Sequence, residues 1–253
     1  MSLMQFNEAV YPETRVGGFT GIDGTIAFYT RVNALVRPNS TVLDIGCGRG
    51  KYDDDPVPFR RTLRILRGKC RRVIGIDVDP IGKTNTCVDE FRLISNHRWP
   101  VEDDCIDLCL SDWCLENLPD PALFFREAWR ALKPDGYLSI RTLNRLSYTG
   151  IAASLVPNHV HGFVLKHAQR DREEQDIFPT VYRCNTVARL RNAMNQQGFT
   201  SCVYGYEPEP AYLAFSKLLY RCAALVGPVT PSHLRTCIFA FGQKPRQVDL
   251  ACT

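Results

Sequence analysis

A short apolar strand that runs directly into a glycine-rich turn limits what this chain can fold into. Residues 41–45 read Thr-Val-Leu-Asp-Ile, and residues 46–50 read Gly-Cys-Gly-Arg-Gly. Glycine lets a backbone turn sharply, and it lets a ligand approach without a Cβ in the way. In a parallel sheet, ligands bind at the carboxyl ends of the strands, beside the point where the strand order reverses. The first strand-to-helix turn therefore indicates the class of ligand.

Strands and helices alternate along the rest of the chain. Further strands are expected at residues 73–76, 91–95, 105–110, 137–142, 199–206 and 234–241. Helices are expected at 25–36, around 59–72, and at 121–132, 186–197 and 211–226. Asp120 and Thr186 are expected to cap two of these helices, and residues 133–136 are expected to form the turn between helix 121–132 and the next strand. This alternation predicts an α/β fold whose mostly parallel sheet is covered on both faces.

The composition is that of a globular protein. Hydrophobic residues make up 45% of the 253 residues and charged residues 23%, which excludes disorder, collagen and coiled coil. The longest stretch without Asp, Glu, Lys or Arg is 146–165, and proline, asparagine and histidine interrupt it, so no transmembrane segment is expected. The first residues lack a basic patch followed by an apolar core, which argues against a secretory signal. We therefore expect a cytoplasmic protein.

The charge is mild overall but unevenly placed. Lys and Arg exceed Asp and Glu by four, which does not by itself indicate a nucleic-acid partner. Seven basic residues and no acid fall within 60–72, where Phe59, Leu63 and Leu66 recur at helical spacing. This pattern favours an amphipathic helix with a solvated basic face over a patch that binds nucleic acid or lipid.

Cysteine and histidine spacing gives no sign of a metal centre. The eleven cysteines are odd in number and include no C-x-x-C pair, which fits free thiols in a reducing compartment. His159 and His161, with Asp176 farther on, are the best candidates for metal ligands, but no Glu-x-x-His or cysteine pattern supports them. We predict no metal.

An acid inside the glycine turn decides between ligand classes. The turn reads D-x-G-x-G-x-G from Asp44 to Gly50, whereas a dinucleotide fold requires G-x-G-x-x-G to hold a pyrophosphate on a helix end. Asp44 would repel a pyrophosphate. It would suit a ligand that carries an ammonium group, or it could fix the amides of its own loop. S-adenosylmethionine has an ammonium group and no phosphate.

With these motifs the chain resembles the class I S-adenosylmethionine-dependent methyltransferases, and in particular methyltransferases of type 11. Four segments match the family pattern in order: VLDIGCGRG at 42–50, GIDVD at 75–79, WPVEDDCIDLCLSDWCLENLPDP at 99–121 and RALKPDGYLSI at 130–140. The resemblance covers residues 41–142 and extends loosely to 242. It implies a Rossmann-like three-layer sandwich with lid insertions, and a seven-stranded sheet of order 3-2-1-4-5-7-6 with strand seven antiparallel.

The resemblance also implies the roles of two acids and of the turn between them. Asp77 would accept hydrogen bonds from both ribose hydroxyls. Asp44 would brace the glycine turn and the methionine end of the cofactor. The turn itself would contact the cofactor through Gly46, Cys47, Gly48 and Gly50.

Further cofactor contacts follow from the same resemblance. Val78 would pack against adenine. Ser95 or Asn96 occupies the position where the family often has an aspartate facing the adenine amine, so this chain departs from the pattern there. Ser111 and Asp112 would lie beside the methionine moiety and the transferable methyl group.

The acceptor and the catalytic base are less well indicated. Many small-molecule members of the family carry histidine where this chain has Asn117. Residues 141–145, Arg-Thr-Leu-Asn-Arg, are similar to the ubiquinone-pathway O-methyltransferases, whose acceptor is a phenol with a lipid tail. His159 or His161 could accept a proton near neutral pH, although a histidine with a purely structural role is also compatible with either position.

These observations support an enzyme that O-methylates a small molecule, a quinone-like compound or a sugar. A module that binds S-adenosylmethionine without turnover is an alternative from another class, and an RNA or protein methyltransferase is a weaker one, because no basic and aromatic stripe is visible beyond the arginine-rich segment. We expect one domain over 1–253, with a helical cap at 1–40, a cofactor-binding core at 41–142, and acceptor-side insertions and the final strands at 143–253.

Acceptor specificity is expected outside the core. The opening helix, residues 145–183 and the insertion 207–233 are rich in aromatic and apolar side chains, which would favour an apolar or ring-bearing acceptor, including one with a lipid tail. Residues 52–58 are expected to cover the cofactor cleft. The helix expected at 211–226 either packs as ordinary core or forms a lid that could also touch a membrane.

Overall fold

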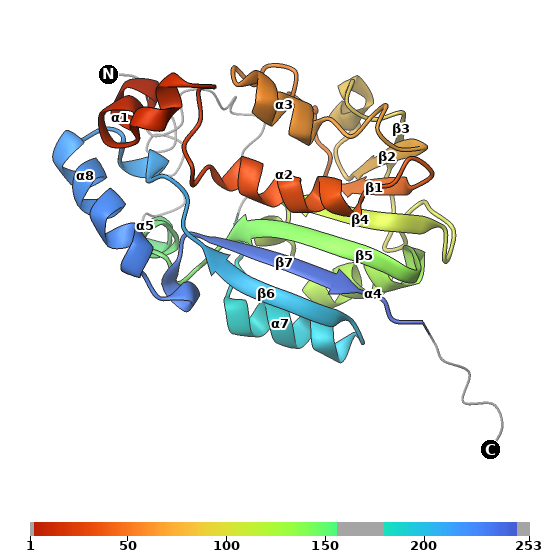
Figure 1. Cartoon of the computed structure of the whole chain (residues 1–253). Coiled ribbons are helices and arrows are strands. Elements are labelled where there is room, and N and C mark those ends of the chain that lie inside the picture. Colours follow the sequence, from red (N-terminus) through yellow and green to blue (C-terminus); the bar gives the residue numbers. More distant parts are fainter. Residues whose placement is uncertain (1–2, 156–179, 247–253) are drawn as a thin grey trace.

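A computed structural model describes residues 3–155 and 180–246 of the chain. A seven-stranded sheet forms the centre of the molecule (Figure 1). The strands are β1 (Thr41–Ile45), β2 (Arg72–Asp77), β3 (Glu90–Leu93), β4 (Ile106–Asp112), β5 (Leu132–Leu143), β6 (Thr200–Tyr206) and β7 (Cys237–Gln243). They lie in the order β3-β2-β1-β4-β5-β7-β6. Strand β7 is antiparallel to both β5 and β6, and the other neighbours are parallel. The expected topology is confirmed.

Helices cover both faces of this sheet. They are α1 (Leu3–Val10), α2 (Gly24–Leu35), α3 (Pro58–Arg64), α4 (Pro121–Ala131), α5 (Tyr148–Leu155), α7 (Val187–Gln196) and α8 (Lys217–Val226). Short 3-10 turns join them at η1 (Pro12–Arg15), η2 (Pro80–Thr84), η3 (Leu115–Asn117), η5 (Ala211–Leu213), η6 (Gly227–Val229) and η7 (Ser232–Leu234). Figure 1 shows α2 on one face of the sheet and α4 and α7 on the other, which is the expected three-layer sandwich. Within the described ranges, none of the helices has the length and apolarity that crossing a membrane requires.

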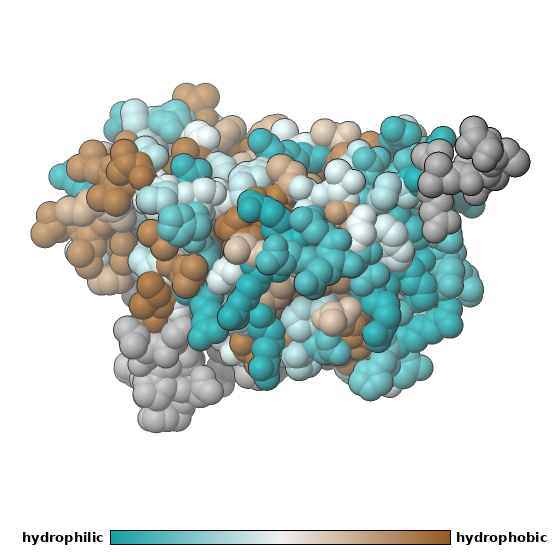
Figure 2. Space-filling view, turned by 90° about the horizontal axis from the view of Figure 1, so that it is seen from below, coloured by the Kyte–Doolittle hydropathy of each residue, from teal (hydrophilic) through white to brown (hydrophobic). Residues whose placement is uncertain are grey.

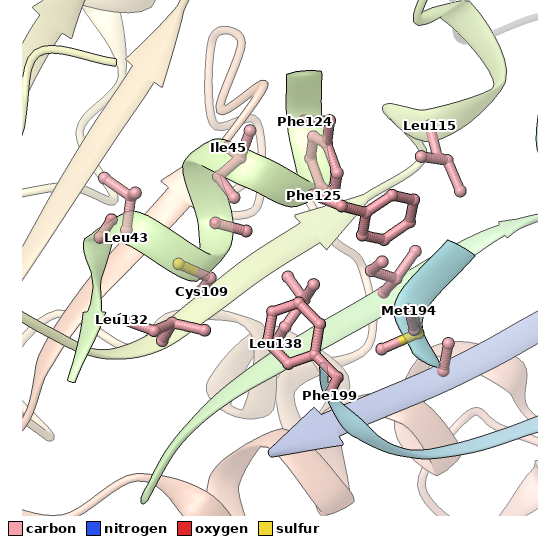
Figure 3. Close-up of a cluster of buried hydrophobic side chains, with 14 of the residues drawn as sticks. Leu43, Ile45, Cys109, Leu115, Phe124, Phe125, Leu132, Leu138, Met194 and Phe199 are labelled. Carbon is pink, nitrogen blue, oxygen red and sulfur yellow. The ribbon is translucent and has the colours of Figure 1, made fainter. Parts of the chain in front are cut away.

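Two hydrophobic clusters hold the layers together. One lies under α4 and α7, where Leu43, Cys109 and Leu138 from the sheet meet Phe125 and Met194 from the helices (Figure 3). The other lies on the opposite face and joins α2 to β1, β2, β4 and β7; its members include Phe28, Val32, Val42, Leu108 and Phe239. Because the central strands carry apolar residues toward both clusters, their middle parts, residues 42–43, 73–76 and 108–110, are apolar runs rather than alternating patterns.

The expected helix caps form as the sequence indicates. The Asp120 side chain accepts a hydrogen bond from the Leu123 amide at 3.1 Å, at the start of α4. Thr186 accepts one from the Arg189 amide at 3.2 Å, at the start of α7. Each cap satisfies an amide that has no partner inside its helix.

The structure corrects the helix expected at 211–226. Residues 211–213 form the turn η5, and α8 begins only at Lys217, because the Ser216 side chain accepts a hydrogen bond from the Leu219 amide and caps a new helix. Phe215 lies in the break and is 72% exposed. A single apolar stripe through the whole segment therefore does not form.

The structure also corrects two expectations around the core. Residues 133–136 do not form a turn between α4 and β5, because β5 starts at Leu132 and absorbs them through a register shift. The basic segment has a helix only as far as Arg64, and its side chains do not form a freely solvated face. Four of its arginines are paired with acids, as Arg60 with Asp23 and Asp55, Arg64 with Asp55, Arg67 with Asp89, and Arg72 with Glu90.

Candidate active site

The carboxyl ends of β1, β2 and β4 meet at one edge of the sheet. Ile45 pairs with Ile76 on one side and with Ser111 on the other. This register brings Asp44, Asp77 and Asp112 to the same edge, at the point where the chain order reverses between β1 and β4. In a doubly wound sheet, this reversal point is where a ligand can enter between the diverging loops.

The glycine turn after β1 is fixed to the end of β2. The amides of Gly46 and Cys47 donate to the Ile76 carbonyl at 2.8 and 3.3 Å. Gly46, Gly48 and Gly50 all have positive φ, at 69°, 47° and 62°, which only glycine adopts without strain. A Cβ at Gly48 would meet no atom within 4 Å, so this side of the turn is open to a ligand.

Asn85, which the sequence did not single out, braces this turn from the loop after β2. Its side-chain amide donates to the carbonyls of Cys47 at 2.9 Å and Gly48 at 3.3 Å, and its Oδ1 accepts from the Cys87 amide at 2.8 Å. A Cβ at Gly50 would lie 1.8 Å from Asn85 Oδ1, so this glycine is required by close contact as well as by its φ. Nothing in the sequence around Asn85 indicates the role, because it depends on the fold bringing two loops together.

Asp77 joins the turn to the end of β2. One carboxylate oxygen accepts from the Gly48 amide at 2.9 Å, and the other accepts from the Asp79 amide at 3.0 Å. The residue is 8% exposed, and each oxygen has a further lone pair that can accept a hydroxyl donor. The adjacent Val78 is 65% exposed and offers an apolar surface next to this carboxylate.

Asp44 is buried without a compensating partner. It is 5% exposed, and within the described residues its carboxylate receives no hydrogen bond. Burial, together with the nearby carboxylates of Asp112 and Asp77, raises the pKa of Asp44 to about 7, against a smaller opposing effect of Arg64. Within the described residues, Asp77 and Asn85 supply the side-chain hydrogen bonds that brace the turn, and the Asp44 carboxylate lies next to it.

Asp112 is held in a buried ion pair. Arg141 Nε donates to Asp112 Oδ1 at 2.6 Å, and Arg141 Nη2 donates to Oδ2 at 2.7 Å. The Tyr29 hydroxyl also donates to Oδ2, at 3.0 Å. Both partners of the ion pair are 3% exposed. Asp112 is therefore already paired with a cation, and it is less able than Asp44 to pair with a ligand ammonium. The neighbouring Ser111 hydroxyl is buried and has no hydrogen-bond partner.

The segment 141–145 ties the end of β5 to three other parts of the chain. Beyond the contact of Arg141 with β4, the Thr142 hydroxyl donates to Glu116 Oε2 at 2.8 Å and accepts from the Asn185 amide at 2.7 Å. The Asn144 side chain donates to the backbone carbonyls of residues 233 and 235 at 2.9 and 2.8 Å. These polar residues fix the loops that surround the sheet edge formed by the carboxyl ends of β1, β2 and β4.

Ser95 and Asn96, which the resemblance assigns to the adenine contact, lie in the loop that follows β3. Both are exposed, and with Leu93 and Trp99 they line a pocket of about 320 Å³. The Ile94 amide donates to the Asp77 carbonyl at 2.8 Å, so the start of this loop is attached to the end of β2. The structure therefore brings Ser95 and Asn96 to the same side of the sheet edge as Asp77.

The two candidate catalytic histidines, His159 and His161, lie outside the described residues, as does Asp176. Within the ranges 3–155 and 180–246, no group of three or more His, Cys, Asp or Glu side chains is placed to hold a metal ion. The part of the site that the structure describes is therefore the sheet edge at the carboxyl ends of β1, β2 and β4, together with the loops around it.

Comparison with known families agrees with this geometry. A family model described as a methyltransferase domain matches residues 26–204, which includes the glycine turn, Asp77 and Asp112. The chain belongs to this methyltransferase-domain family.

Individual relatives match over shorter regions. A probable S-adenosylmethionine-dependent methyltransferase of Mycolicibacterium smegmatis is 30% identical over 123 residues, covering 47% of this chain and 44% of the relative. A ubiquinone biosynthesis O-methyltransferase of Bartonella tribocorum is 29% identical over 116 residues, covering 45% of each chain. The aligned part of this chain thus spans less than half the length of these curated relatives.

Solved structures share the fold over a larger part of the chain. A SAM-dependent methyltransferase from Archaeoglobus fulgidus has a TM-score of 0.53 at 16% identity and covers 96% of this chain and 100% of its own. The [4+2]-cyclase SpnF has a TM-score of 0.52, also at 16% identity, over 87% of this chain and 80% of its own. At this identity the likeness concerns the fold alone.

Proposed function

We propose that this protein transfers the methyl group of S-adenosylmethionine to an oxygen atom of a small-molecule acceptor. The observation that carries the proposal is the pair of carboxylates at the glycine turn. Asp44 is buried and lacks a partner, while Asp77 is oriented by two backbone amides. An amino-acid ammonium and a ribose diol are the groups that would satisfy this pair.

The residues at the sheet edge fit this cofactor. Asp44 would bind the ammonium group, Asp77 the ribose hydroxyls and Val78 one face of the adenine ring, while Gly48 leaves room for close approach. Ser95 and Asn96 would contact the adenine edge, and the unpartnered Ser111 hydroxyl could donate to the methionine carboxylate. When bound, the sulfonium supplies an electrophilic methyl group, and the chain supplies orientation.

Asp112 has a positioning role in this proposal. The guanidinium of Arg141 and the hydroxyl of Tyr29 hold its carboxylate, so the ion pair fixes the ends of β4 and β5 beside the glycine turn. Methyl transfer is an in-line displacement, and most of its acceleration can come from holding the acceptor oxygen and the methyl group collinear and in contact. A rigid sheet edge serves that purpose.

The acceptor is proposed to be a phenol or another hydroxyl on an apolar or ring-bearing molecule, such as a quinone-like compound or a sugar. The similarity to ubiquinone biosynthesis O-methyltransferases supports a phenolic acceptor. Because a neutral hydroxyl is a poor nucleophile, a base is required, and His159 or His161 would remove its proton. The alternative is a module that binds the cofactor without turnover.

A two-stage experiment tests the proposal. Calorimetry should show binding of S-adenosylmethionine and of its demethylated product, and no binding of NAD. Incubation with cofactor and pooled phenols, quinols and sugars should then add the mass of one methyl group to an acceptor, and the His159→Ala and His161→Ala variants identify the base. Cofactor binding without any methylated product would support the binding module, whereas tight NAD binding without S-adenosylmethionine binding would refute the cofactor assignment.

A further inference from the structure

Helix α8 presents leucine side chains to solvent instead of to the core. Leu218 and Leu225 are 72% and 80% exposed, and Leu219 and Val226 are also exposed. At 3.6 residues per turn, positions 218, 222 and 225 share one face, with 219 and 226 beside it. Figure 2 shows hydrophobic residues gathered at this end of the molecule, where Figure 1 places α8.

The opposite face of α8 is anchored to the protein. Tyr220 is fully buried, its ring centroid lies 5.5 Å from that of Phe6, and its hydroxyl is hydrogen-bonded to Asn7. Both of these partners belong to α1. Helix α8 is therefore packed against α1 through Tyr220. Its leucines are exposed although the helix itself is held in place.

Exposed apolar residues continue on both sides of α8. Phe215, just before the helix, is 72% exposed, and Val229, just after it, is 78% exposed. Together with Leu218, Leu219, Leu225 and Val226 they form what we call the α8 surface. An apolar area of this kind on a protein that is otherwise well packed indicates an interaction site.

The exposed charges on α8 itself are both positive. Glu207, whose side chain lies beside Gly227 at the end of the helix, is half-buried and hydrogen-bonded to Thr236. Lys217 and Arg221 are exposed, one helical turn apart, between the leucine face and the buried face. Neither is in an ion pair with any residue in the described ranges. No Asp or Glu occurs anywhere from residue 210 to residue 248.

We propose that the α8 surface docks on an anionic lipid bilayer, with its leucines inserted among the headgroups. A short helix with an apolar face flanked by lysine and arginine, and with no acid in its own sequence, has the composition that binds at the interface of anionic membranes. A protein partner would not require this one-sided charge, and a second copy of the chain would bring the same positive charges together. This inference does not depend on methyl transfer.

Vesicle flotation tests the proposal. The full chain should float with vesicles of phosphatidylcholine and phosphatidylglycerol, more weakly at high salt, and much less with phosphatidylcholine alone. Burying one leucine side chain changes a partition coefficient by about tenfold or more. Leu218→Glu with Leu225→Glu should therefore lower the partition coefficient onto anionic vesicles by at least about tenfold. Asn192→Glu with Gln196→Glu, which adds the same charge to exposed positions of α7, is the matched control and should float nearly as the wild type does.

Folding and an alternative occupant are tested in parallel. Thermal unfolding and cofactor calorimetry establish whether the leucine variant is folded; if it is not, Lys217→Gln with Arg221→Gln, which leaves the apolar face intact, should remove the salt dependence and the preference for anionic vesicles. The proposal is overturned if the wild type does not float with anionic vesicles, or if the leucine variant and the α7 control float equally. It is also overturned if the wild type is a dimer that Leu218→Glu with Leu225→Glu converts to a monomer without vesicle binding.

Discussion

The substitution Asp44→Asn separates the two consequences of a buried carboxylate without a partner. Asparagine has nearly the same shape and carries no charge, so it removes the titration of Asp44 and leaves the packing in place. The variant should therefore change the pH dependence of stability, and it should independently weaken the binding of any ligand that carries an ammonium group.

The stability effect follows from the pKa of Asp44, which burial and the neighbouring carboxylates raise from 3.8 to about 7. Because the folded protein holds this proton more tightly than the unfolded chain does, the stabilisation is fully present below pH 3.8 and is lost as the pH rises toward 7. At about 1.36 kcal/mol per pKa unit, the loss is roughly 4 kcal/mol. The free energy of unfolding of Asp44→Asn minus that of the wild type should therefore increase by roughly 4 kcal/mol when the pH is raised from 4 to 8.

Urea unfolding of both proteins across this pH range measures the difference. Asp54→Asn, at an exposed acid in the loop after the glycine turn, controls for the change in net charge. A difference in free energy of unfolding between Asp44→Asn and wild type that is the same at pH 4.5 and pH 8 would refute the reasoning, because a carboxylate with its ordinary pKa produces no such slope.

Calorimetry of the same variant tests whether Asp44 binds the ammonium group of the ligand. A hydrogen bond to a charged group is worth about 1.5 to 3 kcal/mol, so Asp44→Asn should weaken S-adenosylmethionine binding by roughly 10-fold to 100-fold at pH 8. Adenosine lacks the amino-acid portion, and its affinity should be unchanged. Equal weakening of both ligands would show that Asp44 supports the site as a whole and does not bind the ammonium group.

Three further substitutions test other parts of the site. Asp77→Ala should weaken S-adenosylmethionine binding by about 1 to 3 kcal/mol in calorimetry, because ribose hydroxyls lose a charged acceptor, and an unchanged dissociation constant would mean that the ribose binds elsewhere. Gly50→Ala should lower the melting temperature far more than Gly68→Ala, since both glycines have positive φ but only Gly50 has a side chain within 2 Å of the added Cβ; similar losses would show that the turn can adjust. Arg141→Met should cost about 3 to 5 kcal/mol in urea unfolding by leaving Asp112 buried without its cation, and Arg141→Met combined with Asp112→Leu should recover much of that loss, whereas additive losses would contradict the ion-pair argument.

The sequence predicts the sheet well because its motifs are local. Asp44, the three glycines and Asp77 lie at strand ends, and the apolar runs before them specify buried parallel strands. Asp120 and Thr186 cap their helices through contacts with amides three residues away. Each of these features acts over a few residues, so the chain order alone is enough to place it.

Prediction fails where the result depends on residues far apart in sequence. The helix expected at 211–226 divides because Ser216 provides a cap, and α8 then packs on α1 through Tyr220, more than 200 residues from its partner Phe6. Asp112 is expected beside the methionine moiety, and its ion pair with Arg141 of the neighbouring strand could not be read from the sequence, because β4 and β5 meet only in the fold.

The sequence by itself determined the order of strands and helices along the chain, the glycine turn, and the acids Asp44 in β1 and Asp77 at the end of β2, because each is set by local backbone preference and apolar pattern. Only the tertiary structure decided which carboxylate remains without a partner, which asparagine braces the turn, and which face of α8 is exposed. Those properties depend on burial and on neighbours supplied by other elements, since the pKa of an acid and the exposure of a leucine are properties of their surroundings and not of the residue itself.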